Sequence, residues 1–238
     1  MSLPTLVLVP TYNERANLPA LIAGVMQHPE VRVMIIDDQS PDGTGDLADA
    51  LAREWRGRID VMHRTGGRGL GRAYIEGMQK AVAEPVDVIC QMDADLSHDP
   101  RHLPGLIAAL SAADVVIGSR YVTGGAIVNW PLKRRLLSRF ANAYVRAVTR
   151  LSARDCTSGY RCWRRNALAS LPLDRFFSDG YSFLVEILFV AAQRGCRIVE
   201  VPITFVERRQ GQSKVSRAVL AESAITPWRL VATRKSPR

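Results

Sequence analysis

The stretch VDVICQMDADLSH, residues 86–98, joins an apolar, β-branched run to a turn that is rich in carboxylates. Similar runs, each ending in a polar or glycine-rich turn, occur at Leu6–Val9, Val31–Ile36, Ile59–Met62 and Asp114–Ile117. The segments between them fit helices, and strands that are apolar throughout are typical of a mostly parallel sheet with helices on both faces. We therefore predict an α/β fold whose ligands bind in the turns beyond the carboxyl ends of the strands.

The composition sets the broad class of protein. The 238 residues are 47% hydrophobic and 23% charged, which excludes a disordered chain, a fibrous repeat and a disulfide-stapled miniprotein. No stretch approaches the roughly 20 uninterrupted apolar residues of a membrane span, and we expect no secretory signal. The four cysteines lack CxxC spacing, so we expect neither structural zinc nor a disulfide framework. We expect the protein to reside in a reducing cytosol.

The net charge of +9 is unevenly distributed along the chain. Residues 1–129 hold 11 basic and 16 acidic side chains, whereas residues 130–165 hold 10 basic and one acidic. Residues 207–238 add eight basic and two acidic side chains. This polarity predicts that one side of the molecule meets an anionic surface or substrate. The basic blocks lack interleaved aromatic residues, so we expect no nucleic acid partner, which a gel shift would test.

The carboxylates Asp93 and Asp95 are candidate metal ligands. Residues i and i+2 of an extended segment point to the same side, and two oxygen ligands with open positions suit Mg²⁺ or Mn²⁺ bridging to a diphosphate. The alternative is that these residues form a turn and cap a helix before Pro100. Capping explains Asp99 well but explains Asp93 and Asp95 poorly. Asp37 and Asp38, at the end of the second strand, form a pair in which a carboxylate can accept hydrogen bonds from a base or ribose.

Other motifs favour structural interpretations. The glycines in residues 66–71 do not match a phosphate-binding fingerprint, so we expect a flexible, closely approached loop. His98 and His102 stand four residues apart, but Pro100 between them and the lack of a third ligand favour surface histidines over zinc. Asp42 or Thr44 is expected to cap the next helix.

Residues 131–151 predict a helix with Pro131 at its first position. One of its faces is apolar (Leu132, Leu136, Leu137, Phe140, Tyr144, Val148 and Leu151), and the opposite face is basic or polar (Arg134, Arg135, Ser138, Arg139, Asn142 and Arg146). This pattern suits a helix that lies in a membrane interface. It suits equally a helix whose apolar face packs on the core while its arginines are solvated. The concentration of basic residues at 130–165 favours the membrane interface. Residues 217–231, with Trp228, form a second, weaker amphipathic stretch.

Towards the C-terminus, Glu200–Phe205 predicts a short strand. The loop at residues 207–214 then combines a glycine with separated cations. Such a loop is suited to close over phosphates.

Taken together, the turns resemble the polyprenyl-phosphate (dolichol-phosphate) mannosyltransferases of glycosyltransferase family 2. The resemblance runs in order over nearly the whole chain to about Val215. It is carried by Pro10-Thr11-Tyr12-Asn13-Glu14, Asp37-Asp38-x-Ser40-Pro41-Asp42-Gly43-Thr44, Asp93-Ala94-Asp95-Leu96-Ser97-His98, Gly118-Ser119-Arg120-Tyr121, Trp130-Pro131, Thr157-Ser158-Gly159-Tyr160-Arg161, and Glu200-Val201-Pro202-Ile203-x-Phe205-x-x-Arg208 through Ser213-Lys214.

The resemblance implies a GT-A (Rossmann-like) domain over residues 1–215, which includes the basic helix at about 131–151. A C-terminal amphipathic helix and tail would follow at 216–238. It also implies an enzyme of the dolichyl-phosphate β-D-mannosyltransferase type. Such an enzyme transfers mannose from GDP-mannose to a polyprenyl (dolichyl) phosphate with inversion, with Mg²⁺ or Mn²⁺ as cofactor.

Carried over by matching position, the resemblance also implies roles for individual residues. Donor and cofactor binding would involve Pro10, Tyr12, Glu14, Ile36, Asp38, Asp93, Ala94, Asp95, Arg120, Arg208 and Lys214. The metal would be held by Asp93, Asp95 and Ser97, although Ser97 stands where some relatives have the longer Gln. Asp95, Arg120 and Arg208 would be catalytic, and Arg134 and Ser138 would lie near the acceptor phosphate.

Two alternatives keep the fold but change the substrates. One uses UDP-glucose to make a polyprenyl-phosphate glucose, and the other transfers to a non-lipid acceptor. Many relatives carry transmembrane helices after this domain, and this sequence shows none. We therefore expect peripheral attachment to the cytoplasmic face of a membrane, directly or through a small membrane-anchoring partner.

Overall fold

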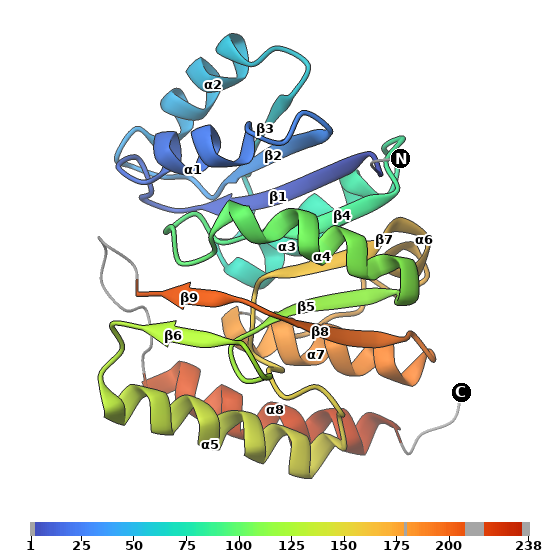
Figure 1. Ribbon diagram of the computed structural model, residues 1–238. Coiled ribbons are helices and arrows are strands. Elements are labelled where there is room, and N and C mark those ends of the chain that lie inside the picture. The colour runs from blue at the N-terminus through green and yellow to red at the C-terminus, as the bar shows by residue number, and fades with distance from the viewer. Residues whose placement is uncertain (1–2, 179, 208–216, 235–238) are drawn as a thin grey trace.

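The computed structural model describes residues 3–178, 180–207 and 217–234 (Figure 1). Its central sheet contains β1 (Thr5–Thr11), β2 (Val31–Asp37), β3 (Ile59–His63), β4 (Val88–Gln91), β5 (Val115–Ser119), β7 (Arg161–Arg164) and β8 (Ile198–Pro202). The seven strands lie in the order β3-β2-β1-β4-β7-β5-β8. Neighbours are parallel except at β7, which is antiparallel to β4 and β5. The predicted mostly parallel α/β sheet is confirmed.

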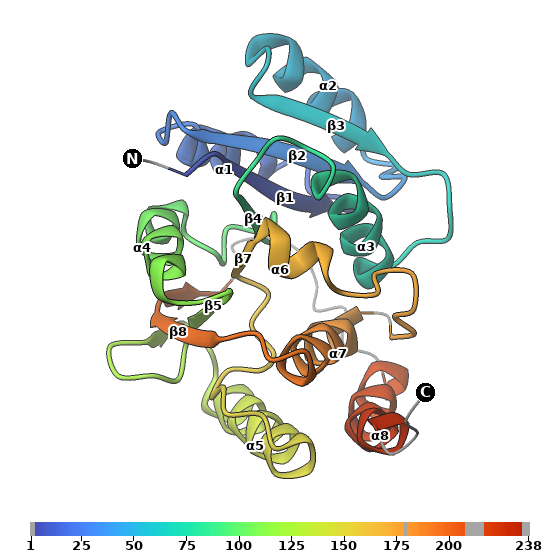
Figure 2. The same cartoon turned by 90° about the vertical axis from the view of Figure 1, so that its right-hand side faces the viewer.

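Helices cover both faces of the sheet because the strands are apolar on both sides. In β1, Leu6 and Leu8 belong to one core cluster and Val7 and Val9 to the other, as strand alternation requires. The Val7 face carries α1 (Leu18–Val25), α2 (Thr44–Glu54) and α4 (Leu103–Ala109). The Leu6 face carries α3 (Leu70–Ala81), α6 (Arg165–Ala169) and α7 (Gly180–Gln193). Figure 2 shows α4 and α7 on opposite sides of the sheet.

The predicted cap at Asp99 is present, whereas the N-cap of α2 is Gly43 and not Asp42 or Thr44, although Asp42 still accepts a first-turn amide. Asp42 Oδ1 accepts the Thr44 amide at 3.0 Å at the start of α2. Asp99 Oδ1 accepts the Arg101 amide at 2.9 Å and begins the 3₁₀ turn Pro100–His102, which leads into α4. A second 3₁₀ turn, Leu110–Ala112, follows α4. Each side chain satisfies a backbone donor that would otherwise have no partner within its helix.

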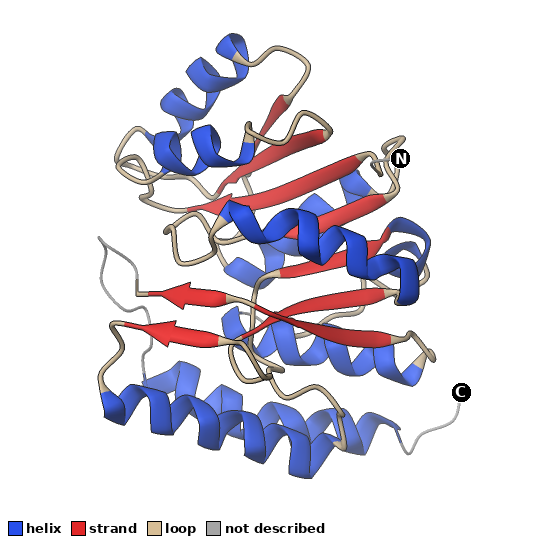
Figure 3. Ribbon diagram, in the orientation of Figure 1, coloured by secondary structure: helices blue, strands red, loops and turns tan. Residues whose placement is uncertain are grey.

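The predicted strand Glu200–Phe205 is divided between two sheets. β8 ends at Pro202, and β9 (Thr204–Val206) pairs in parallel with β6 (Ala126–Val128) in a separate two-stranded sheet (Figure 3). Ile203, between them, donates its amide to Ser119 at 3.0 Å and accepts the Ala126 amide at 2.9 Å. The expectation of one continuous strand is wrong, because the chain passes from the central sheet to the two-stranded sheet at Ile203.

The outer layer consists of α5 (Leu132–Thr149) and α8 (Arg217–Arg234), which lie side by side beyond α7 (Figure 1). Pro131 is the residue before α5 rather than its first helical residue. The inward face of α5 is Asn142, Val145 and Thr149, which are buried. Leu132, Leu136 and Phe140 are 69%, 56% and 69% exposed. The core-packed alternative is therefore wrong for the N-terminal part of the apolar stripe, which is exposed, whereas at the C-terminal end Leu151 lies in the core and Tyr144 packs against it.

The exposed apolar surface continues from α5 onto α8. Ile225 and Trp228 are large, exposed apolar side chains there, while Leu230 is buried in the core shared with α7. Tyr144 of α5 donates its hydroxyl to the Ala224 carbonyl of α8 at 2.6 Å. None of the helices in the described part of the chain combines the length and apolar content needed to cross a membrane.

Cys90 and Cys162 form a disulfide between β4 and β7, in contrast to the expectation of unpaired cysteines. The two residues are 72 positions apart, but the antiparallel register places them directly opposite each other, with their Cα atoms 4.2 Å apart. Sequence spacing does not show such a pairing because it depends on strand order. Cys156 and Cys196 are free.

Candidate active site

Two adjoining cavities lie beyond the carboxyl ends of β1, β2 and β4. The first, the β1–β2 cavity, has a volume of about 410 Å³. The second, the α5 cavity, has a volume of about 270 Å³ and extends between α5, α7 and α8. Asp93, Asp95 and Leu70 line both. The carboxylate pair therefore lies where the two cavities meet.

Asp93 is held in place through its backbone and its side chain. Its amide donates to Nδ1 of His98 at 3.0 Å, and Tyr74 donates its hydroxyl to Asp93 Oδ1 at 3.4 Å. Burial raises the pKa of Tyr74 well above its ordinary value, and the charge of Asp93 adds to the rise, so the phenol stays a donor. Gly159 lies against the carboxylate, where an added Cβ would come within 3.3 Å of Oδ1.

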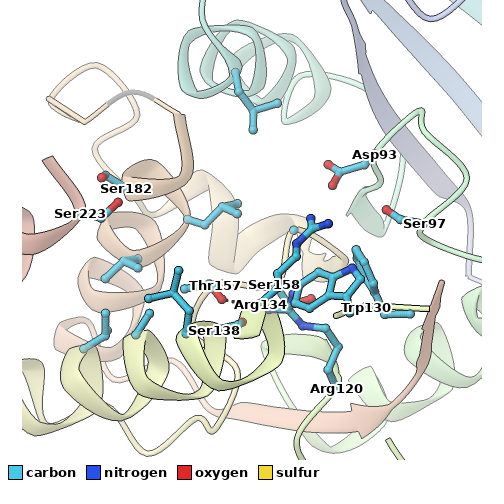
Figure 4. Close-up of a pocket in the computed structure, with 18 of the residues that line it drawn as sticks. Asp93, Ser97, Arg120, Trp130, Arg134, Ser138, Thr157, Ser158, Ser182 and Ser223 are labelled. Atoms are coloured by element: carbon cyan, nitrogen blue, oxygen red, sulfur yellow. Dashed lines mark hydrogen bonds between the residues drawn. The ribbon is translucent and has the colours of Figure 1, made fainter. Parts of the chain in front are cut away.

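The side chains around Asp95 fit a divalent cation. Asp95 Oδ1 accepts the Ser97 amide at 3.1 Å. Ser97 Oγ is buried and has no hydrogen-bond partner in the structure, and it points with Asp93 into the same space (Figure 4). No group of three or more His, Cys, Asp or Glu side chains among the described residues forms a metal site. A cation here would therefore take a few hard oxygen ligands and leave positions for a ligand's own oxygens.

The β1–β2 cavity brings most of the predicted donor-binding residues together. Pro10, Tyr12, Glu14, Asp38, Ala94 and the carboxylate pair line it. The side chain of Ile36 does not, because it is fully buried and packs towards Gly77 of α3. Sequence reasoning missed Arg68, which donates to the Tyr12 hydroxyl and lies 5.1 Å from the centre of its ring.

Asp38 organises the loop that carries Arg68. Its Oδ2 accepts the Gly69 amide at 2.8 Å, and its Oδ1 forms a buried ion pair with Arg64. Arg64 also donates to the Gly67 carbonyl at 2.9 Å. Gly69 has a φ of +154°, a conformation that residues with a side chain rarely adopt. The glycine-containing loop at residues 66–71, which we predicted to be closely approached, is therefore folded against the β1–β2 cavity.

Arg120 lies in the α5 cavity, between Asp155 and three aromatic rings. Its Nε and Nη2 donate to the two Asp155 carboxylate oxygens at 2.7 and 2.6 Å. Burial alone would lower the pKa of Arg120, but the charge and hydrogen bonds of Asp155 outweigh it and raise the pKa. Figure 4 shows Arg120 close to Trp130, whose ring centre lies 5.6 Å from the guanidinium carbon. These bonds leave Nη1 of this permanent cation available to an anion.

Arg134 and Ser138 line the same cavity, as the one-turn spacing on α5 predicts. The Arg134 guanidinium stacks on Trp130, with 4.1 Å between its carbon and the ring centre, and donates to Glu207 at 2.6 Å. Ser138 Oγ accepts the Tyr121 hydroxyl at 2.7 Å. The predicted residues Arg208 and Lys214 lie outside the described residues.

The two histidines are internal supports and not surface residues, so that expectation is wrong. His98 is 1% exposed and stacks on Tyr160, with the ring centres 4.9 Å apart. His102 is half-buried, and its Nε2 accepts the Thr204 amide at 3.1 Å. Burial lowers the pKa of His102. Neither partner is near its histidine in sequence, since Tyr160 lies directly before β7 and Thr204 lies in β9.

The far part of the α5 cavity is mostly apolar, although the hydroxyl side chains of Ser182, Ser223 and Thr226 also line the cavity. Away from Asp93, its walls come from α5, α7 and α8, and they include Leu137, Ala141, Val145, Leu184, Val185 and Pro227. The polar end thus holds carboxylates and arginines, whereas the other end would accept a hydrocarbon.

Comparison with known proteins identifies the family to which this chain belongs. Residues 6–171 match the family described as glycosyl transferase family 2. The chain is 46% identical over 230 residues to an undecaprenyl-phosphate mannosyltransferase of Micrococcus luteus, covering 95% of this chain and 94% of that protein. It is 47% identical over 222 residues to a polyprenol monophosphomannose synthase of Mycolicibacterium smegmatis, covering 92% and 83%.

Solved structures agree with the fold. The glucosyl-3-phosphoglycerate synthase of Mycobacterium tuberculosis, in complex with Mn²⁺, UDP and phosphoglyceric acid, aligns with a TM-score of 0.69 at 18% identity. The alignment covers 99% of this chain and 80% of that one. At this identity the likeness concerns the fold alone. The chain belongs to glycosyltransferase family 2, and relatives that share almost half of its residues are polyprenyl-phosphate mannosyltransferases.

Proposed function

We propose that this protein transfers mannose from GDP-mannose to a polyprenyl phosphate, with inversion and with Mg²⁺ or Mn²⁺ as cofactor. The observation that carries the proposal is the position of Asp93 and Asp95, where a cavity with acidic side chains on its wall meets one that is cationic at its near end and mostly apolar beyond. A sugar nucleotide and a lipid phosphate need such a pair of compartments. The names of the two close relatives support both the sugar and the acceptor class.

The donor would occupy the β1–β2 cavity. Tyr12 and Arg68 offer an aromatic face and a cation, and Glu14 lies on the same wall. Asp93, Asp95 and the unpartnered hydroxyl of Ser97 would hold the cation. When bound, the metal would neutralise charge that develops on the leaving diphosphate. UDP-glucose remains the alternative donor, because the same walls also suit a pyrimidine nucleotide.

The acceptor phosphate would bind at the near end of the α5 cavity. Arg120 and Arg134 supply positive charge there, and the Ser138 hydroxyl lies on the same wall. A phosphate monoester has a second pKa of about 6 and is mostly dianionic at neutral pH. An acceptor oxygen would attack C1 of mannose, the bond from C1 to the diphosphate oxygen would break, and GDP would leave with that electron pair. No strong general base is required.

The exposed apolar side chains of α5 and α8 support attachment to a membrane. Leu132, Leu136, Phe140 and Trp228 face outward beside the basic residues of α5. Such a surface is suited to the boundary between headgroups and acyl chains. Because the donor is a water-soluble nucleotide, we place the protein peripherally on the cytoplasmic face. The apolar walls of the α5 cavity argue against the alternative of a non-lipid acceptor.

The test is incubation of the purified chain with GDP-mannose, Mn²⁺ and a polyprenyl phosphate in detergent, with mannolipid as the readout. UDP-glucose and a water-soluble phosphate acceptor serve as parallel arms. Asp95→Asn should abolish transfer, whereas the exposed loop variant Asp174→Asn should retain it. Formation of a glucolipid only, or transfer only to the soluble acceptor, would refute the proposed substrates. Unchanged turnover in Asp95→Asn would refute the metal assignment.

A further inference from the structure

A third hollow lies on the opposite flank of α5 from the apolar end of the α5 cavity. It has a volume of about 360 Å³ and is lined by Tyr121, Arg139, Asn142, Ala143, Arg146 and Arg154. Arg139 and Arg146 are seven residues, or about two helical turns, apart on α5. Arg154 comes from the segment between α5 and β7. We call this hollow the arginine pocket.

The three arginine side chains of the pocket are exposed and have no direct carboxylate partner in the described part of the chain. No ion pair in the described residues involves Arg139, Arg146 or Arg154, whereas Arg120 and Arg134 each have one. Asp155 is taken by Arg120, and both Glu200 oxygens accept backbone amides, from Arg154 at 2.7 Å and from Asp155 at 2.9 Å. Three like charges that share a hollow repel one another, and an anion between them removes that repulsion.

We propose that the arginine pocket binds the phosphate of an anionic phospholipid headgroup. Guanidinium groups recognise phosphate oxygens through paired, charge-assisted hydrogen bonds. The choice of a lipid follows from the neighbouring surface, since Leu136 and Phe140 stand exposed on the adjoining flank of α5. With that stripe in the acyl region, the pocket lies at the level of the headgroups. The proposal rests on the proposed attachment to a membrane, but not on which sugar nucleotide or acceptor the enzyme uses.

The pocket shares a wall with the α5 cavity. Tyr121 donates its hydroxyl to Ser138 Oγ at 2.7 Å. Asn142 Nδ2 donates to the Ser138 carbonyl at 3.0 Å and to Thr157 Oγ1 at 3.1 Å. Ser138 and Thr157 line the α5 cavity on the other side of this wall. A headgroup phosphate would therefore fix α5 on the membrane in a position that aims the acceptor cavity at the lipid layer.

The test compares two double variants that remove equal charge from the same helix. Arg139→Gln/Arg146→Gln removes the pocket, and Lys133→Gln/Arg135→Gln removes two exposed cations that do not line it. Binding is measured by flotation with vesicles of phosphatidylcholine containing 30% phosphatidylglycerol, and with vesicles of phosphatidylcholine alone. Inorganic phosphate is titrated separately by calorimetry, and circular dichroism checks that each variant is folded.

We expect the pocket variant to lose at least ten times more affinity for phosphatidylglycerol vesicles than the matched variant. Binding to phosphatidylcholine alone should differ less than twofold between them. Equal losses in the two variants would overturn the proposal, because the effect would then be general charge attraction. Tight binding of inorganic phosphate that only the pocket variant loses, with vesicle binding unchanged, would assign the pocket to a free anion and overturn the lipid headgroup.

Discussion

His98 Nδ1 accepts the backbone N–H of Asp93 at 3.0 Å, so a buried imidazole fixes the turn that carries the carboxylate pair. The ring is itself held by stacking on Tyr160 and by edge contact with Phe205. Its Nε2 lies 3.7 Å from Asp93 Oδ2. The histidine therefore acts on the candidate metal site through the position of Asp93.

Replacement of His98 should weaken metal binding as well as lower stability. In His98→Ala the Asp93 amide loses its acceptor, and an unsatisfied buried donor costs about 1–3 kcal/mol. We expect an increase of about 10- to 100-fold in the Mn²⁺ concentration needed for half-maximal transfer, the usual effect of losing a residue that orients a metal ligand. The exposed-residue variant His63→Ala is the control. Metal dependence equal to that of the wild type would show that His98 does not position Asp93.

Acidification should lower stability through His102. Burial depresses its pKa in the folded state, and its Nε2 must stay unprotonated to accept the Thr204 amide. The unfolded chain therefore binds a proton more readily near pH 6.5, so this contribution is present above that pH and is lost as the pH falls through the lower folded-state pKa. The Tm should fall between pH 7.5 and 5.5, and less steeply in His102→Gln, which keeps an acceptor but does not titrate. Parallel slopes in the two proteins would contradict this.

Arg68 should contribute to donor binding. It lies over Tyr12 at the mouth of the β1–β2 cavity, within the region where a diphosphate would bind. A charge-assisted hydrogen bond contributes about 1.5–3 kcal/mol, so Arg68→Ala should raise the donor KM by about 10- to 100-fold. The kcat should change less. Arg53→Ala, on the exposed side of α2, is the matched control. A normal donor KM with a reduced kcat would place Arg68 in the chemical step instead.

We expect the buried pair Arg120–Asp155 to support the structure of the proposed acceptor site. Removing one partner of such a pair leaves an uncompensated charge and costs about 3–5 kcal/mol. Asp155→Ala should therefore lower the free energy of unfolding by that amount, measured in urea. Adding Arg120→Ala should recover part of the loss, because the double variant buries no lone charge. Strictly additive losses would show that the two side chains do not act as a pair.

The strands and the carboxylate turn were predictable because their signals are local. Apolar runs that end in Asp93–Asp95 or in Asp38 need no knowledge of the rest of the chain. Asp155 carried a weaker signal that was not used, since it is the single acid among ten basic residues at 130–165. The roles of His98 and Arg68 had no such signal, because the residues that define them, such as Phe205 and Tyr12, are distant in sequence and meet them only in the folded chain.

The outward stripe of α5 was the ambiguous element, because an apolar helix face has the same pattern whether it meets a core or a bilayer. The structure exposes Leu136 and Phe140, and a variant can test what covers them. Replacing both by Ser removes apolar contact of about 2–3 kcal/mol per side chain with the acyl region. Leu136→Ser/Phe140→Ser should therefore weaken binding to lipid vesicles by at least a hundredfold at high salt, where charge attraction is screened. Because the stripe does not support the fold, Tm should stay within a few degrees of the wild-type value. A large fall in Tm with vesicle binding retained would mean that the stripe stabilises the protein and does not contact the membrane.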